Sequence, residues 1–403
     1  MSAGGWMLLG CADDENAGSS DIQPVPMGPP AQPRGGPQLC ASGFVGGTFL
    51  RTVPFDNEGP ALLGVPTGAG LDGRLYDDLA SLAPDTRVTP TSRFYIRTRY
   101  PDRIDPAAPW RVRISGLVEP GGEVALSFED LAPLIGPRGV HLLECSGNGG
   151  GAFFGMLSTA EWDGVPLLAL LDAKTKRLPV ATRVLVSGFD DHSQPSVRST
   201  ACASWIFTLG ELAETGAFLA TRMNGEPLPS DHGFPLRLVV PGWYGCTCIK
   251  WVDAISFVDD TAPATSQMQE FASRTMQQGT PELARDYLPA EIDQAAMPVR
   301  VEEWRVGGRI AYRVLGLAWG GKRPTDALSI RMSSLIRSTA RLSFERVGLC
   351  APVTTNATWS WWSYAFEAQS AGRHEIRLRV DDPAIRTRRL DSGFYARSVT
   401  LAR

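Results

Sequence analysis

The sequence predicts an α+β domain built on antiparallel or mixed sheets, followed by an all-β sandwich domain. In the first two thirds of the chain, short β-branched and aromatic segments bounded by turn residues outnumber helical segments. From residue 298 onward, short strand-like segments recur at the spacing of a β-sandwich. A length of 403 residues suits two or three domains.

The first 39 residues are expected to form a signal-like segment and a disordered tether. Residues 12–38 hold six prolines and four glycines with almost no apolar side chains, which is the composition of a tether. The preceding "LLGC" resembles a bacterial lipoprotein box, with Cys11 as the lipidated residue, although no Lys or Arg precedes it. We therefore expect a periplasmic or cell-envelope protein with a lipid anchor at Cys11; the alternative is a frayed apolar end.

Residues 40–262 form the predicted α+β domain. Its loop-rich opening, 40–92, is expected to wrap a surface. A helix is expected over 166–174, and Thr208 with Glu211 has the spacing of a capping box before a second helix. Strands are expected over 93–100, 110–116, 182–188 and 235–242.

Residues 263–297 are the predicted connection and 298–403 the predicted sandwich. The connection begins with a polar stretch that suits a crossover between domains. Strands of the sandwich are expected over 299–306, 309–319, 327–334, 339–347, 360–368 and 374–380.

Composition excludes several classes of function. A net charge of −4 gives no electrostatic footprint for nucleic acid. Four histidines make a multi-histidine metal site unexpected, and no apolar run approaches the roughly 18 residues of a spanning helix. Seven scattered cysteines are too few for a disulfide scaffold, and their odd number leaves at least one unpaired within the chain.

One cysteine stands in an unusual place. The apolar run "VHLLE" leads Cys145 into a turn of Ser, Asn and four glycines. Taken alone, the more frequent role of such a residue is that of a buried structural cysteine. Its surroundings along the chain favour another role.

Four blocks in order resemble the sulfite oxidase family of molybdenum enzymes. The resemblance covers roughly residues 45–403 and implies a pterin-binding catalytic domain followed by an immunoglobulin-like domain that pairs protomers. We therefore expect a homodimer formed through 298–403, with aromatic residues in its interface. The blocks are "FYIRTRYP" (94–101); "ECSGN" (144–148) with "WDGVPL" (162–167); "MNGEPLPSDHGFPLRLVVPG" (223–242) with "IKW" (249–251); and "GLAWGG" (316–321), "WSWW" (359–362) and "RHEIRLRVDD" (373–382).

The resemblance implies a molybdenum–molybdopterin cofactor with Cys145 as the single protein ligand to molybdenum. A thiolate is a natural ligand for a soft, sulfur-rich centre, and the glycines that follow let the backbone approach it. An arginine fork and a lysine point charge suit the pterin phosphate. The positions that match cofactor contacts are Arg97, Asp190, His232, Arg237 and Lys250. The alternative is that Arg237 and Lys250 are exposed charges on strands and that Asp190 is a turn residue.

The sequence departs from the family pattern around the substrate pocket. Gly149–Gly151 stand where the family carries arginines, Phe271 stands where it carries a tyrosine beside the metal, and Arg99 replaces a histidine. The pocket is therefore expected to be roomier and less cationic, with Arg97 as its remaining anion contact and catalytic residue. Sulfite is expected to be a poor substrate, unless Arg198 supplies the missing charge.

The predicted function is two-electron oxygen-atom transfer on a small molecule, with water as source or product of the oxygen. No C-x-x-C-H haem motif and no haem- or flavin-binding segment occurs, so an external electron-transfer protein such as a c-type cytochrome is expected. One alternative is a reductase of the methionine-sulfoxide type on the same fold. Another is a cofactor-free secreted binding protein.

Two other motifs are interpreted as structural. Cys246 and Cys248 are a poor zinc pair and are expected to pack against the pterin. His141 precedes Cys145 on its strand and is expected to be a core histidine.

Overall fold

The computed structural model describes residues 34–56, 62–100, 109–149, 154–189, 203–334, 343–368, 370–388 and 390–402. These residues belong to one compact unit that starts at Pro33. The predicted anchor at Cys11 lies outside them. Within these ranges, none of the helices has the length and apolar character needed to cross a membrane.

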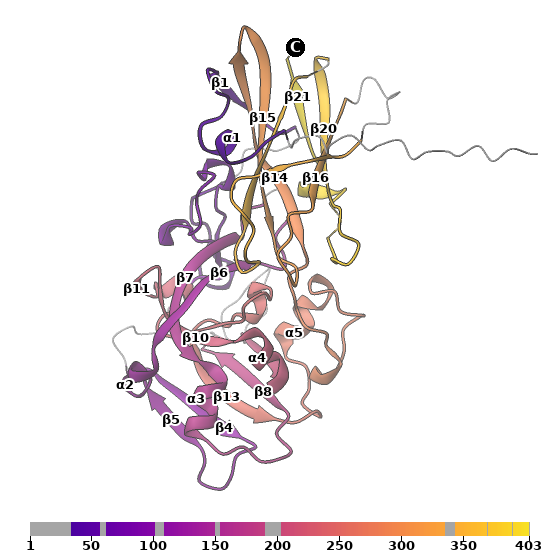
Figure 1. Cartoon of the computed structure of the whole chain (residues 1–403). Helices are drawn as coiled ribbons and strands as arrows, with labels where there is room; N and C mark the ends of the chain where they lie inside the picture. The colour runs from indigo at the N-terminus through magenta and orange to yellow at the C-terminus, as the bar shows by residue number, and fades with distance from the viewer. Residues whose placement is uncertain are drawn as a thin grey trace, which may run out of the picture. The chain divides into compact units, whose positions relative to one another are not determined.

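A mixed five-stranded sheet forms the base of the first domain (Figure 1). Its order is β5 (Val124–Ser127), β4 (Arg111–Gly116), β13 (Val252–Val258), β8 (Arg183–Gly188) and β9 (Ser204–Thr208). β13 pairs parallel with β4, and the other neighbours are antiparallel. The strands expected over 110–116 and 182–188 are confirmed.

A second sheet carries the strand that precedes Cys145. Its order is β11 (Glu226–Pro227), β10 (Phe218–Met223), β7 (Leu157–Pro166) and β6 (Gly136–Glu144), and β12 (Arg237–Val239) also pairs with β10. The two sheets share one apolar core, to which Trp162, Leu219 and Ile255 belong. β6 therefore ends against a packed interior.

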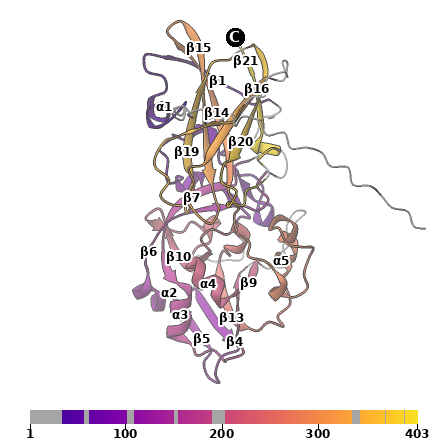
Figure 2. The same cartoon turned by 45° about the vertical axis from the view of Figure 1, so that its right-hand side comes forward.

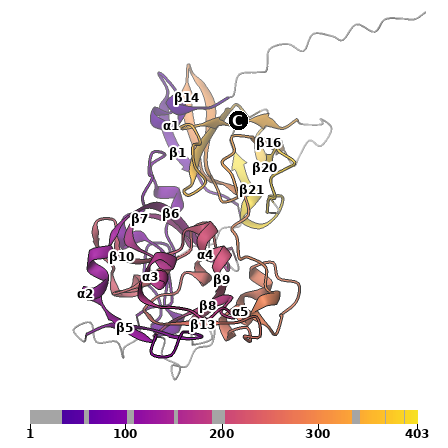
Figure 3. The same cartoon turned by 60° about the horizontal axis from the view of Figure 1, so that its bottom comes forward.

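Helices α3 (Leu167–Lys174) and α4 (Leu209–Thr215) lie side by side (Figure 3). Thr208 Oγ1 accepts from Glu211 N at 3.0 Å, and Glu211 Oε2 accepts from Thr208 N at 2.7 Å, which confirms the capping box. The other α-helices are α1 (Pro37–Ser42), α2 (Phe128–Leu131) and α5 (Ser266–Phe271). The 3₁₀ helices are η1 (Gly70–Asp72), η2 (Leu79–Ser81), η3 (Thr91–Arg93), η4 (Ala132–Leu134), η5 (Ser230–His232), η6 (Gly245–Thr247), η7 (Ala272–Arg274), η8 (Ala284–Asp286) and η9 (Gly393–Tyr395).

The strand expected over 93–100 is much shorter in the structure. Only β3 (Ile96–Arg97) is extended, and it pairs with β2 (Arg74–Leu75). η3 precedes it, and Thr98 has a φ of 68°, which ends the strand. Arg97 is thereby placed at a bend.

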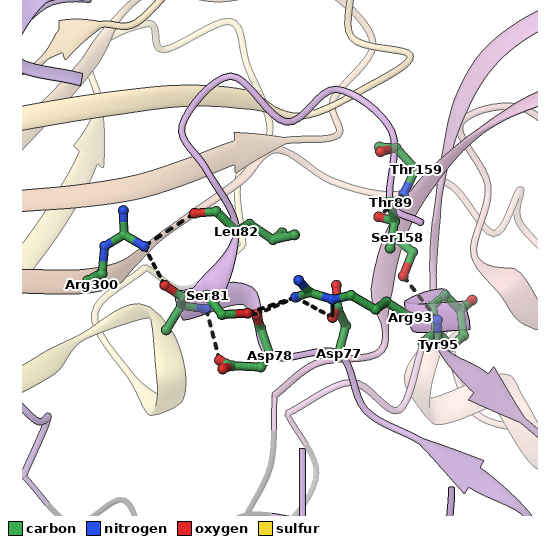
Figure 4. A network of polar contacts seen from close by, with 11 residues as sticks. Asp77, Asp78, Ser81, Leu82, Thr89, Arg93, Tyr95, Ser158, Thr159 and Arg300 are labelled. Atoms are coloured by element: carbon green, nitrogen blue, oxygen red, sulfur yellow. Dashed lines mark hydrogen bonds and ion pairs between the residues drawn. The ribbon is translucent and has the colours of Figure 1, made fainter. Parts of the chain in front are cut away.

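A network of polar contacts fixes the segment before β3 (Figure 4). Arg93 Nε donates to Asp77 Oδ1 at 2.9 Å, and its Nη2 donates to the carbonyl of Asp78 at 2.8 Å. Arg300 from the second domain donates to the carbonyl of Leu82 at 3.2 Å. Side-chain contacts therefore help to hold the stretch between β2 and β3, together with backbone bonds such as that from Thr89 N to Thr159 O.

The second domain has two antiparallel sheets around one core. One has the order β1 (Thr48–Val53), β14 (Ala295–Val306), β15 (Arg309–Trp319), β19 (Ser360–Phe366) and β18 (Gly348–Leu349). The other has the order β17 (Glu345–Arg346), β16 (Leu328–Ser334), β20 (Gly372–Val380) and β21 (Arg397–Leu401). Val314, Tyr364, Ile330 and Ile376 from both sheets share a core, as a sandwich requires.

The second domain begins earlier in the chain than predicted, and it also includes a segment near the N-terminus. β1 pairs with β14 across residues 48–53, so this segment completes the second domain instead of wrapping the first (Figure 2). β14 begins at Ala295, inside the predicted connection. Cys40 in α1 forms a disulfide with Cys350, which no local pattern indicated. The pairing partner of an edge strand and the partner of a disulfide cysteine leave no periodic signal in the sequence when they lie about 250 or more residues away.

The tryptophans of "WSWW" are not available to a partner protein in this structure. Trp359, Trp361 and Trp362 are buried within the chain. The indole N–H groups of Trp359 and Trp361 donate to the carbonyl of Thr86 at 2.8 and 3.2 Å, and that of Trp362 donates to Leu317 O at 3.1 Å. The argument that these rings form a dimer interface is therefore wrong, because they pack the interior of the chain; the homodimer itself stays a prediction.

Replacing both Cys40 and Cys350 by alanine is expected to lower the free energy of unfolding by about 2–5 kcal/mol, because the bond closes a long loop of the unfolded chain. Thermal and urea denaturation of the oxidised wild type and the double variant would measure this. The wild type treated with a reductant should match the variant. Equal stability of all three would contradict the prediction.

Candidate functional site

A pocket lies beside the end of β6, and it gathers five of the six predicted site residues. These are Arg97, Cys145, His232, Arg237 and Lys250. The sixth, Asp190, lies outside the described residues, as does Arg198. The five residues are contributed by β3, the turn after β6, η5, β12 and the segment before β13.

Cys145 is held at the pocket wall by a tight turn. Its N–H donates to Met156 O at 3.0 Å, and its carbonyl accepts from Asn148 N at 2.9 Å. Asn148 Oδ1 accepts from the N–H groups of Gly155 and Met156 at 3.2 and 3.1 Å, which closes the turn. Burial raises the pKa of the Cys145 thiol, and nearby arginines oppose that shift.

Arg237 is a buried cation that lacks a carboxylate partner among the described residues. Its side chain lies on β12, Nη1 donates to His232 O at 3.3 Å, and Nε has no hydrogen-bond partner. Burial lowers the pKa of Arg237, and the ionisable groups of Cys248 and Tyr95 oppose that shift. An unpaired buried guanidinium favours an anion in its pocket.

Lys250 is bonded to the backbone of the pocket. Its Nζ donates to the carbonyl oxygens of Arg97, Thr98 and Asp231 at 3.2, 2.6 and 2.9 Å, and lies 4.4 Å from the ring centre of Trp251. These contacts shape the bend after β3. Lys250 therefore contributes positive potential and backbone geometry.

His232 is neutral in this environment. Burial and the charges of Arg237 and Lys250 lower its pKa to about 3. The ring packs against Phe94, with 5.3 Å between ring centres. The ring also bonds to the backbone of Thr91, so one ring nitrogen is left for a bound group.

The sequence and fold of this chain match one family of known proteins. Residues 98–266 match the model of the oxidoreductase molybdopterin binding domain. Sulfite oxidases of mitochondria from Macaca fascicularis and Homo sapiens are 27% identical over 326 residues, which cover 75% of this chain and 57% of either relative. The chain carries a molybdopterin-binding oxidoreductase domain and is similar in sequence to the sulfite oxidases.

The family includes relatives with other names and lengths. A nitrate reductase [NADPH] of Emericella nidulans is 30% identical over 221 residues, covering 49% of this chain and 24% of that protein. The sulfane dehydrogenase SoxCD from Paracoccus pantotrophus has the same fold, with a TM-score of 0.60 at 20% identity over 79% of this chain and 78% of that chain. The chain spans a little over half the length of the sulfite oxidases it matches.

The chain carries more positive charge near its cysteine than its sequence indicated. Arg97, Arg74 and Arg274 all act to lower the pKa of the Cys145 thiol. Arg74 lies opposite Arg97 across β2 and β3, and burial together with Arg97 lowers the pKa of Arg74 to about 10. Of these three arginines only Arg97 lines the pocket, so the expectation of a pocket less cationic than that of the family stays a prediction.

Arg274 occupies the space beside the glycine turn. A Cβ placed on Gly147 would lie 3.4 Å from Arg274 Nη1 and 3.8 Å from Cys145 Sγ. The guanidinium carbon of Arg274 lies 5.3 Å from the ring centre of Phe271, which lines the pocket. Sequence reasoning missed Arg74 and Arg274 because neither lies in one of the family blocks.

The remaining predicted residues divide between the pocket and positions outside it, where His141 is half-buried instead of part of the core. Cys246 and Cys248 line the pocket, and Cys248 Sγ accepts from Val240 N at 3.4 Å. His141 bonds to Arg138 O at 2.8 Å and is absent from the pocket lining. Arg99 Nε pairs with Asp231 Oδ2 at 3.0 Å, so it supports the pocket wall through an ion pair.

The neutral state of His232 predicts a dependence of stability on pH. The unfolded residue takes up a proton near 6.5 and the folded residue only near 3, so the free energy of unfolding should fall by up to about 1.4 kcal/mol per pH unit as the pH drops below about 6.5. The variant His232→Gln should have a flatter profile over this window. Urea denaturation from pH 7 to 4 would compare them, and parallel profiles would contradict the assignment.

Proposed function

We propose that this chain is a molybdenum–pterin enzyme that carries out two-electron oxygen-atom transfer on a small anionic substrate. The observation that carries the proposal is the arrangement of one buried thiol and a buried, unpaired guanidinium in a single pocket. Cys145 is 5% exposed and so is Arg237. A buried guanidinium without a carboxylate partner is costly unless a ligand completes it, and a thiol in the same pocket is a suitable ligand for a soft metal.

The residues present fit the cofactor of the family. In the described part of the chain no three His, Cys, Asp or Glu residues are placed to hold a metal, which suits a metal that takes one protein thiolate and is otherwise held by its own pterin. The unpartnered Nε of Arg237 is a donor for a phosphate oxygen. When bound, the molybdenum–pterin group supplies the two-electron redox change and the oxygen-atom transfer.

We assign the protein's own groups the following roles. The Cys145 thiolate holds the metal, and the neighbouring arginines stabilise its negative charge. Arg237 binds the phosphate, neutral His232 donates or accepts one hydrogen bond, and Lys250 adds positive potential. Asp190 as a partner of the pterin ring stays a prediction.

Arg97 and Arg274 are the proposed anion contacts for the substrate. Arg97 Nη2 lies 3.9 Å from Glu270 Oε1, so part of its charge is balanced, whereas Arg274 stacks on an uncharged ring. A substrate anion needs such donors to leave water. This cation set favours an anionic substrate over a neutral sulfoxide, and it reopens sulfite as a candidate.

The proposal also includes the cellular location of the protein and its partners. The Cys40–Cys350 disulfide supports a periplasmic or cell-envelope location, because disulfides persist in oxidising compartments. An external electron-transfer protein, a lipid anchor at Cys11 and a homodimer stay predictions. Each can be tested on the purified full-length chain.

The variant Cys145→Ser should lose turnover and most bound molybdenum while it keeps its fold. Serine conserves the size of the side chain but replaces a soft ligand with a poor one. Molybdenum per chain, steady-state rates and circular dichroism would be measured together on protein made in a molybdenum-replete host. Wild-type activity in the variant would exclude the ligand role.

The variant Arg274→Met should lower kcat/KM for an anionic substrate by about tenfold or more, because a hydrogen bond to a charged group contributes about 1.5–3 kcal/mol. Sulfite with an artificial electron acceptor serves as the anionic probe, and dimethyl sulfoxide with an artificial electron donor serves as the neutral one. Arg285→Met is the control, because Arg285 is an exposed arginine that pairs with Asp286 outside the pocket. An unchanged ratio of the two substrates in Arg274→Met would remove Arg274 from the substrate site.

A further inference from the structure

The residue before Cys145 carries a fully buried carboxylate. Glu144 is 0% exposed, and its Oε1 and Oε2 accept from Arg388 Nη1 and Nη2 at 2.7 and 2.6 Å. Trp319 Nε1 donates to Oε2 at 2.8 Å. Both donors come from the second domain, since Trp319 ends β15 and Arg388 lies between β20 and β21.

The same carboxylate reaches the turn that presents the thiol. Asn148 Nδ2 donates to Glu144 Oε1 at 3.4 Å, and the Oδ1 of Asn148 closes the turn by accepting from Gly155 and Met156. A shift of Glu144 therefore moves the Cys145 backbone directly and moves Asn148 through a hydrogen bond.

Arg388 also contacts the opposite wall of the pocket. Its guanidinium carbon lies 5.2 Å from the ring centre of Tyr244, the residue before Gly245, which lines the pocket. A Cβ on Gly245 would collide with the hydroxyl of Tyr95 and lie 3.2 Å from the carbonyl oxygen of Glu144. The two walls of the pocket therefore touch where Gly245 meets the carbonyl of Glu144. Arg388 contacts Glu144 on one wall and Tyr244, the residue before Gly245, on the other.

We infer that Arg388 and Trp319 are positioning residues for Cys145, and that they act through Glu144. The second domain thereby sets the position of the Cys145 thiol. The inference rests on the proposed function only in taking the metal as the group that this thiol binds. The electrostatics agree with this geometry. Burial acts to lower the pKa of Arg388, but Glu144 raises this pKa well above its usual value.

A purely structural role predicts a different outcome from a positioning role. A buried ion pair often adds little net stability compared with apolar residues of the same volume, whereas loss of one partner leaves the other charge buried without a partner. Loss of a structural brace exposes all buried thiols together. Loss of a positioning contact exposes Cys145 selectively.

The test is alkylation of cysteines by iodoacetamide in the full-length chain made without the pterin, with each site read by mass spectrometry. Cys145 and Cys248 are buried to a similar extent, at 5% and 3% exposure, so Cys248 is the internal control. In Arg388→Met, alkylation of Cys145 relative to Cys248 should rise by roughly 10- to 100-fold. Arg388→Lys keeps the charge and should retain most of the protection.

Two further variants keep the test informative if Arg388→Met does not fold. Trp319→Phe removes one donor to Glu144 and keeps an aromatic ring, and it should raise the ratio by about tenfold. Arg386→Met is the matched control, because Arg386 pairs with buried Asp293 at 2.6 Å in the same segment without touching Glu144. Its ratio should equal that of the wild type.

The positioning role would be overturned by an unchanged ratio in Trp319→Phe, and in Arg388→Met where that variant folds, or by an equal rise at Cys145 and Cys248. The readout needs no metal, so it stands apart from the proposed function. A wild-type chain that takes up no molybdenum would overturn the function alone. In chains that do take it up, Trp319→Phe should also shift the visible sulfur-to-metal absorption band at unchanged molybdenum content.

Discussion

The end of β6 imposes the constraint on which the pocket depends. Adjacent residues of a strand point to opposite sides, and here they are Glu144 and Cys145, one a buried carboxylate and the other a buried thiol. Neither side chain is stable in an apolar interior as an anion without positive partners. The fold therefore brings arginines to both sides, Arg388 from the second domain and Arg97 with Arg74 from the segment around β2 and β3.

Two buried arginines show how the interior and the pocket differ. Arg388 is satisfied by a bidentate carboxylate and surrounded by aromatic rings, so its charge is balanced within the chain. Arg237 is more deeply buried. The Nε of both arginines has no hydrogen-bond partner in the described residues, but Arg237 also has no carboxylate partner among them. The difference separates a group that completes the fold from one that a ligand completes. Binding of an anion to Arg237 therefore stabilises the folded chain by mass action.

The sequence was informative where the signal is local. Alternation and turn residues located β4 and β8, the capping box located α4, and the family blocks located the five residues that line the pocket. It was silent where contacts are distant. The Glu144–Arg388 pair spans 244 residues, the disulfide spans 310, and β1 joins a sheet formed 250 residues later. Such contacts follow from how the domains pack, and packing has no period in a single sequence.

The departures from the family pattern act together in the structure. Arg274 lies beside Gly147 in the cysteine turn, and the ring of Phe271 supports its guanidinium. Phe271 thus supports an arginine whose positive charge reaches the thiol from η7 instead of from the cysteine turn. On the proposed function, a change in the segment 271–274 alters the anion contacts of the pocket, while the turn that holds Cys145, braced by Glu144, stays unchanged.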